Sequence, residues 1–255
     1  MRALPSWTIM LASILLAGLL WVGLTEGGLV RDLFLPGPAD LWSGLNELLE
    51  DGYKGRALLE HAGMSLMRVG AGFLTGAMVG TALGLGMGYL PRLNALAAPF
   101  VEFLRPLPQL AYLILLIVWL GIGETSKITM LFLAALPVSA IAARDGVANV
   151  PPERVRVALA LGATRWQVFA QVLLPSALPE IMVGARLAAG IVYGTLIASE
   201  IIAGSSGIGW MILDAGRFLR SDYVFVGIGM IGLTGIAIDR ALLLLERRVV
   251  HWAGR

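Results

Sequence analysis

Six stretches of apolar residues, each bounded by polar or charged positions, run along the chain. A helix that crosses a bilayer needs about 20 mostly apolar residues, and these stretches reach or approach that length. They cover residues 7–24, 65–89, 93–120, 128–143, 181–203 and 224–245. The pattern predicts an all-α membrane protein with six transmembrane helices, organised as a single domain over residues 1–255.

Two of the predicted spans contain prolines. Pro106 and Pro108 interrupt the third span, and Pro137 lies within the short fourth span. Because proline removes a backbone donor and strains the preceding turn, we expect the third span to be kinked or to begin late. Backbone groups freed at such breaks must find partners inside the protein.

The second predicted span carries a glycine at every fourth position. The repeat consists of Gly72, Gly76, Gly80, Gly84 and Gly88. At 3.6 residues per turn these positions form a slowly winding stripe without side chains, which another helix can approach closely. Packing within one subunit is favoured over a contact between subunits.

Charged residues predict the orientation of the spans. The loop over residues 26–60 is acidic, whereas arginines gather in the chain ends and in the loops on the other side: Arg2, Arg92, Arg144, Arg154, Arg156, Arg165, Arg240, Arg247, Arg248 and Arg255. Because basic residues favour the cytoplasm, we expect both termini and residues 144–179 to be cytoplasmic. The first span also has features of a secretory signal peptide, but no convincing cleavage site follows it, which favours a retained span.

Composition agrees with a bilayer environment. The chain is 58% hydrophobic and 14% charged, whereas a soluble domain carries about 25% charged residues. The formal net charge of +2, without a basic tract, argues against a nucleic-acid partner. There is no cysteine, which excludes disulfides and thiolate metal sites.

Common catalytic motifs are absent from the sequence. It contains no G-x-x-x-x-G-K-[ST] loop for nucleotide phosphates, no H-E-x-x-H and no G-x-S-x-G. His61 and His251 are isolated, and we expect both at the surface or the membrane interface rather than on a metal. We therefore expect no catalytic residue, no metal site and no cofactor bound by this chain.

The loop over residues 144–179 is too polar to span a membrane and too patterned for a linker. Pro151 and Pro152 favour a helix that begins at Glu153. Such a helix places three apolar residues on one face, and the arginines at 154 and 156 away from it. The apolar residues are Val155, Ala158 and Leu159.

A second short helix is expected in the same loop. Gly162 ends the first helix, and Thr164 is a suitable N-cap for a helix over residues 165–174. Pro175 and Pro179 are expected to stop it before the fifth span. The loop would then present two short helices to a partner in the cytoplasm.

The spacing within this loop matches a known signature: E-A-A, three residues, glycine, nine residues, I-x-L-P. Gly162 takes the glycine position, Ala158 the second alanine, and residues 172–175 (V-L-L-P) the end. Arg156 stands where the glutamate is usual and Val157 replaces the first alanine. In this loop the chain resembles the inner-membrane permeases of binding-protein-dependent ATP-binding-cassette (ABC) importers.

The resemblance extends over roughly residues 35–252. Segments at residues 102–108, 119–127 and 198–209 are similar to the taurine, sulfonate and nitrate branch of that family, and most of all to taurine permeases. The resemblance implies import of a small anion or zwitterion, with taurine or another sulfonate favoured. Nitrate, cyanate or another small organic anion is the alternative, and a stand-alone secondary carrier or channel is the alternative of another class.

The resemblance also implies a type I ABC importer permease fold in the bacterial inner membrane. Two permease copies would form the pathway, two separate ATPase subunits would bind ATP and Mg²⁺, and a periplasmic or lipoprotein binding protein would deliver the substrate. The loop residues implied in ATPase coupling are Glu153, Arg156, Ala158, Gly162, Ala163, Arg165 and Pro175.

Polar residues within the spans are candidates for the translocation pathway. Glu102 and Arg105 are three residues apart, so they could pair on one helix face or gate the substrate. Glu200 would repel an anion, which favours a role in fixing a helix or contacting the binding protein. Four neutral residues could line the pathway or bond to a neighbouring helix: Gln109, Tyr112, Thr195 and Ser199.

Overall fold

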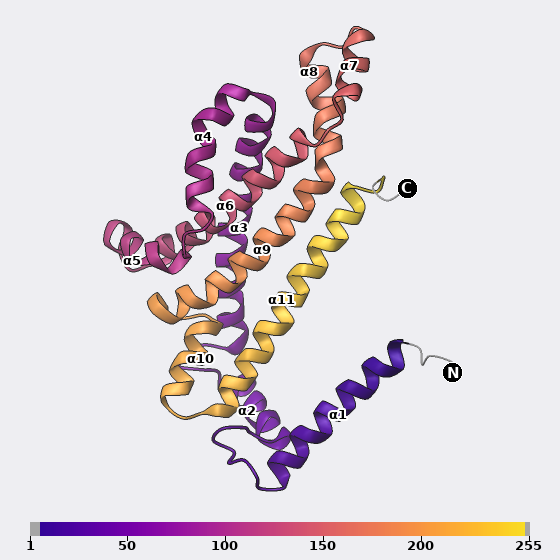
Figure 1. The fold of residues 1–255 in the computed structure, drawn as a ribbon. Helices are drawn as coiled ribbons and strands as arrows, with labels where there is room; N and C mark the ends of the chain where they lie inside the picture. The colour runs from indigo at the N-terminus through magenta and orange to yellow at the C-terminus, as the bar shows by residue number, and fades with distance from the viewer. Residues whose placement is uncertain (1–5, 253–255) are drawn as a thin grey trace.

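A computed structural model describes residues 6–252, and over this range the chain forms helices and no β-strand (Figure 1). Arg2 and Arg255, two of the basic residues used to orient the spans, lie outside the described residues. Five helices are long and apolar enough to cross a membrane. They are α1 (Ser6–Glu26), α3 (Leu58–Tyr89), α6 (Glu124–Ala148), α9 (Leu174–Ala203) and α11 (Ser221–Val249).

Shorter helices connect these five. They are α2 (Pro38–Glu50), α4 (Pro91–Leu104), α5 (Gln109–Leu120), α7 (Pro152–Ala160), α8 (Arg165–Val168), the π-helical segment η1 (Phe169–Leu173) and α10 (Ile208–Arg217). Figure 1 shows α7 and α8 at one extreme of the molecule and α2 and α10 at the other. These extremes are called the α7 end and the α10 end below.

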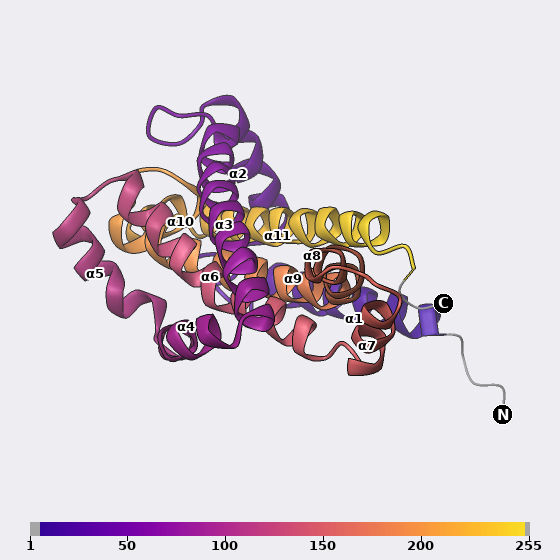
Figure 2. The ribbon, with the colours of Figure 1, turned by 90° about the horizontal axis from the view of Figure 1, so that it is seen from above.

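The third predicted span is broken rather than kinked. Helices α4 and α5 meet at an angle of 101° across a short break that contains Pro106 and Pro108. The expected effect of the prolines is confirmed, but it is larger than a kink. Helix α5 projects sideways from the bundle in both views (Figures 1 and 2). The count of six spans holds if this bent pair is taken as one span.

The core of the molecule lies where α3, α6 and α9 pack together. Buried side chains from all three helices meet there, and many of them are small. They are Val69, Phe73, Leu131, Ala134, Ala135, Ala188, Ala189, Val192 and Leu196. The glycine stripe of α3 faces α6: a Cβ atom added at Gly76 would lie 2.5 Å from the carbonyl oxygen of Phe132 and 2.8 Å from Cβ of Ala135. The expectation that the stripe packs within one subunit is confirmed.

Replacing Gly76 with alanine is expected to destabilise the fold by about 1–3 kcal/mol, because the added methyl must push α3 away from α6. Gly70→Ala is the matched control on the same helix, since a Cβ there meets nothing within 4 Å and alanine is the better helix former. Thermal unfolding of the purified protein in detergent measures both. Equal melting temperatures for the two variants would contradict the close α3–α6 contact.

A second cluster closes the α10 end. Leu48 of α2, Tyr53, Met211 of α10 and Tyr223 of α11 are buried together. The acidic loop that follows the first span therefore contains a helix, α2, which is too short and amphipathic to have the apolar pattern of a span.

Arg220 links α2 to α11 at this end. Its Nη2 lies 2.7 Å from Oε2 of Glu47 and 2.8 Å from Oδ2 of Asp222. The hydrogen bond from Arg220 lowers the pKa of the Glu47 carboxyl from its ordinary value.

Candidate functional site

Helices α7 and α8 form a paired projection at the α7 end (Figure 1), and its turn follows a standard helix-ending geometry. Gly162 has φ +86°, a left-handed conformation that favours glycine. The amide of Gly162 donates to the carbonyl of Leu159, and the amide of Ala163 donates to the carbonyl of Ala158, both at 3.0 Å. These two bonds form a Schellman motif. The motif explains physically why Ala158 and Gly162 have this spacing in the loop signature.

The second helix of the projection begins as predicted. Thr164 is its N-cap, with Oγ1 accepting a hydrogen bond from the Gln167 amide. In return, the Thr164 amide donates to Oε1 of Gln167 at 2.8 Å. This reciprocal capping box fixes the direction in which α8 leaves the turn.

Most residues of the projection are exposed on the surface of the chain. Its large apolar side chains are uncovered: Val157, Leu159, Leu161 and Trp166. Leu161 is 82% exposed, and several large exposed apolar side chains on one short projection indicate an interaction surface. The predicted apolar face is only partly correct, because Val155 and Ala158 pack inward while Leu159 does not.

The residues implied in coupling fall into three groups. Glu153, Arg156, Gly162 and Arg165 are exposed, and Arg156 donates to Glu153 at 2.7 Å. Ala158 and Ala163 are half-buried and pack against the cluster beneath the projection. Pro175 lies apart from the others, within the helical continuation toward the membrane.

The expectation that Pro175 and Pro179 stop the second helix is wrong. Helix α8 continues through η1 into α9, giving an unbroken helical run over Arg165–Ala203. The π-helical turn Phe169–Leu173 directly precedes α9, and Pro175 takes an opening position of α9. A π-helical turn alters the hydrogen-bond register, so the missing amide of Pro175 is accommodated without ending the helix. The projection is therefore joined to the long helix α9 without a flexible link.

A groove of about 590 Å³ lies beneath α7. Apolar residues from the α3–α4 turn, the end of α6 and α7 line most of it, together with Arg156 and Arg165. Its position next to the exposed apolar side chains enlarges the surface that a partner could occupy.

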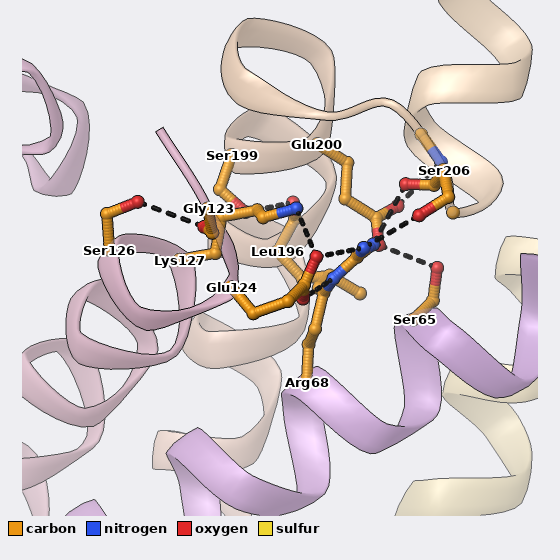
Figure 3. A network of polar contacts seen from close by, with 12 residues as sticks. Ser65, Arg68, Gly123, Glu124, Ser126, Lys127, Leu196, Ser199, Glu200 and Ser206 are labelled. Carbon is orange, nitrogen blue, oxygen red and sulfur yellow. Dashed lines mark hydrogen bonds and ion pairs between the residues drawn. The ribbon is translucent and has the colours of Figure 1, made fainter. Parts of the chain in front are cut away.

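A cluster of charges joins α3 to the start of α6, the last turn of α9 and the turn before α10 (Figure 3). Arg68 of α3 is fully buried and contacts two carboxylates. Its Nη1 lies 2.6 Å from Oε1 of Glu200, and its Nε and Nη2 lie 2.6 and 2.8 Å from the two oxygens of Glu124. Glu200 is also fully buried. This bidentate and paired geometry satisfies charges that would be costly alone in an apolar interior.

Further partners complete the cluster. Lys127 lies 2.8 Å from Glu124, so two cations balance two carboxylates. Arg68 also donates to the carbonyl and hydroxyl oxygens of Ser206, both at 2.9 Å. Ser65 donates to Glu200 at 2.8 Å, and the Gly209 amide donates to the other oxygen of Glu200 at 2.9 Å. The cluster therefore ties α3, α6 and α9 to the turn that begins α10.

The expectation that His61 lies at the surface is wrong. Its ring is fully buried and stacks on Trp210 with ring centroids 5.7 Å apart. Nδ1 accepts a hydrogen bond from the Gly207 amide at 3.1 Å, so Nε2 carries the proton that it donates to the carbonyl of Tyr53. His251, by contrast, is exposed as expected.

Sequence reasoning missed Arg68 and Ser65, although a signal for them exists. His61, Ser65 and Arg68 are spaced at i, i+4 and i+7, so they share one face of α3. An arginine inside an apolar stretch is itself a mark of function or of a buried partner.

The candidate pathway residues are not brought together. The expected pairing of Glu102 with Arg105 is wrong: Glu102 accepts from Arg144 of α6 at 2.8 Å, because Arg105 lies at the end of α4 where the chain turns away. Thr195 and Ser199 are buried and donate to carbonyls of their own helix. Glu200 fixes α9 to α3 and α10, which is one of the two roles expected for it.

The remaining candidates lie near the α4–α5 break. Gln109 begins α5, and Tyr112 is half-buried beside Leu113, Leu116 and Met130. The side chain of Arg105 forms no hydrogen bond or ion pair with any residue in the range 6–252, and it lines a separate cavity of about 220 Å³.

Comparison with known proteins identifies the family. The family model described as "binding-protein-dependent transport system inner membrane component" matches residues 61–251. The taurine transport system permease of Escherichia coli K12 is 39% identical over 89% of this chain and 82% of its own. A putative aliphatic sulfonates transport permease of Bacillus subtilis is 33% identical over 96% and 86%. A bicarbonate transport system permease of Synechocystis is 29% identical over 91% and 84%.

A solved structure agrees with the fold. A chain of the MetNI methionine ABC transporter, in an inward-facing conformation, superposes with a TM-score of 0.64 at 20% identity. The match covers 75% of this chain and 95% of that one. The family model, together with the several helices that are apolar and long enough to cross a membrane, places the chain as a multi-pass component of the inner membrane. The chain belongs to the family of inner-membrane components of binding-protein-dependent transport systems.

Proposed function

We propose that the chain is the membrane-spanning subunit of an ATP-driven importer for taurine or another small sulfonate. The observation that carries this proposal is the 39% identity to a taurine transport permease over 89% of the chain. The similarity to a sulfonate permease over nearly the whole chain supports the same substrate class. Nitrate, cyanate or another small organic anion is the alternative substrate.

The energy source would be a separate chain. This sequence has no phosphate-binding loop of the G-x-x-x-x-G-K-[ST] type, while the α7–α8 projection presents uncovered apolar side chains. We assign that projection to the cytoplasmic face, where each of two ATPase subunits, carrying ATP and Mg²⁺, receives one copy of it. In this orientation both termini are cytoplasmic.

The proposed transport cycle uses this geometry. Because α8 runs without interruption into α9, movement of the projection by a closing ATPase is transmitted along α9 to the buried charge cluster. The cluster holds α3, α6, α9 and the start of α10 as one body, so the body tilts as a unit. Two permease copies tilting against each other alternate the access of a pathway between them, and a periplasmic or lipoprotein binding protein delivers substrate at the α10 end. A stand-alone carrier or channel would not require such a projection.

Uptake by purified components tests the proposal. The permease is reconstituted in vesicles with the ATPase and the binding protein encoded beside it, and labelled taurine is supplied with ATP. Taurine uptake that needs all three components is expected. Uptake of nitrate or cyanate but not of taurine would shift the substrate, and uptake by the permease alone would favour the stand-alone carrier.

A further inference from the structure

An unpaired cation lies at the break of the bent pair α4–α5. Helix α4 has 14 residues, so it carries the chain about 20 Å from its start before Arg105. Across residues 6–252 no side chain pairs with Arg105. Arg105 is exposed on the surface of the single chain, and a charge exposed within a membrane-spanning segment is costly unless it meets a partner or water. Its exposure therefore favours a position that faces a pathway rather than lipid.

Arg105 lines a cavity of about 220 Å³ between the break, α6 and α9. The cavity has one residue of opposite charge, Glu180 of α9, and an otherwise apolar wall. The wall consists of Val138, Ile141, Ala142, Val183, Gly184 and Leu187. Val183 and Leu187 are more than half exposed, so the cavity opens to the surface of the chain.

The two charges of this cavity do not meet each other. Glu180 accepts hydrogen bonds from Nδ2 of Asn149 at 3.1 and 3.2 Å, and it has no ion pair with Arg105 or with any other cation in the described part of the chain. Opposite charges around one cavity attract, yet here the space between them stays open. The arrangement suits a small ligand that carries both charges.

Another cavity provides a useful contrast. It lies between α9 and α11 and is lined by Arg186 and Asp239, but these two residues form an ion pair at 2.9 Å. Its cation is already neutralised by its own wall. Arg105 is therefore the better candidate for binding an anionic group from outside the chain.

We propose that Arg105 and Glu180 form a substrate site in the pathway, with Arg105 binding a sulfonate group and Glu180 binding an ammonium group of the same molecule. The guanidinium offers several N–H donors in a fork that matches tetrahedral oxyanions. The apolar wall contacts the short methylene chain between the two groups. This inference rests on the proposed function and narrows its substrate class to zwitterionic aminosulfonates such as taurine.

The first test is uptake of labelled taurine by the complete complex in vesicles. Arg105→Gln and Glu180→Gln are each expected to lower uptake at least tenfold, and Arg105→Lys is expected to retain more uptake than Arg105→Gln. Arg92→Gln is the matched control, because Arg92 is an exposed, unpaired arginine on the same helix, outside the cavity. All variants should keep their ATPase subunits and basal ATP hydrolysis.

The second test separates the two charges. The measurement is binding of labelled taurine to the permease–ATPase complex in the absence of the binding protein. Ethanesulfonate has the sulfonate but lacks the ammonium, so it should displace labelled taurine more weakly than unlabelled taurine does. In Glu180→Gln the two compounds should compete equally.

Two results would overturn the site. One is taurine uptake by Arg105→Gln and Glu180→Gln at the rate of Arg92→Gln, and the other is loss of the ATPase subunits from these variants, which would indicate a structural role. A wild-type complex that imports nitrate but no taurine would instead refute the proposed substrate.

Discussion

Replacing Arg68 with methionine is expected to lower the free energy of unfolding by about 3–5 kcal/mol, because it leaves a buried charge without its partner. Glu200 is fully buried and has no cation other than Arg68 within the described residues. Glu124 is less affected, since it keeps Lys127 at 2.8 Å. Chemical denaturation of the purified protein in detergent, followed by tryptophan fluorescence, measures the loss.

Two control variants test whether the loss of stability comes from the unpaired buried charge. Arg156→Met breaks an exposed ion pair with Glu153, and such pairs contribute only about 0–1 kcal/mol. The double variant Arg68→Met with Glu200→Gln removes both charges, so it should be more stable than Arg68→Met alone. If Arg68→Met costs no more than Arg156→Met, the buried cluster does not hold the helices together.

Replacing Gly162 with valine is expected to abolish most ATP-driven uptake while leaving membrane insertion intact. The reason is backbone conformation rather than crowding: φ is +86° and a Cβ there meets nothing within 4 Å. A β-branched residue in this region costs about 1–3 kcal/mol, so the turn would open and α7 would lose its direction relative to α8. Uptake and retention of the ATPase subunit are measured together.

Gly162→Asn separates backbone strain from the loss of glycine itself. Asparagine tolerates the left-handed conformation far better than valine does, so this variant should keep most of the uptake. Equal uptake by Gly162→Val and the wild type would refute the role of a rigid turn. Equal loss in both variants would mean that the surface, and not the turn, requires glycine.

Features with local periodicity could be predicted from the sequence. The long helices were predictable from the apolar stretches, because the thickness of the hydrocarbon core sets the length of a spanning helix. The close α3–α6 contact was predictable from the glycine stripe, because a helix surface without side chains lets another helix approach closely. The turn at Gly162 and the cap at Thr164 were predictable because both depend on residues a few positions apart.

Features that depend on distant partners were not predictable in the same way. No pattern in the residues near Arg68 indicates that it pairs with Glu200, which is 132 positions away in the sequence. The 101° bend between α4 and α5 depends on the packing of α5 against α6, where Leu113 and Leu116 meet Met130, and prolines at 106 and 108 do not specify that packing. Pro175 and Pro179 were misjudged because the π-helical turn before them is not visible in the residue pattern.

The central claim is that the α7–α8 projection docks on a separate ATPase, and cross-linking tests it most directly. The chain has no cysteine, so single cysteines can be placed without removing any other. Leu161→Cys lies at the tip of the projection and is 82% exposed at the native residue, while Leu29→Cys, at a residue 76% exposed in the α1–α2 loop of the α10 end, is the control. A reagent that joins cysteine to nearby lysines should link the ATPase at position 161 and not at position 29. Absence of a product at 161, or equal products at both positions, would contradict the account.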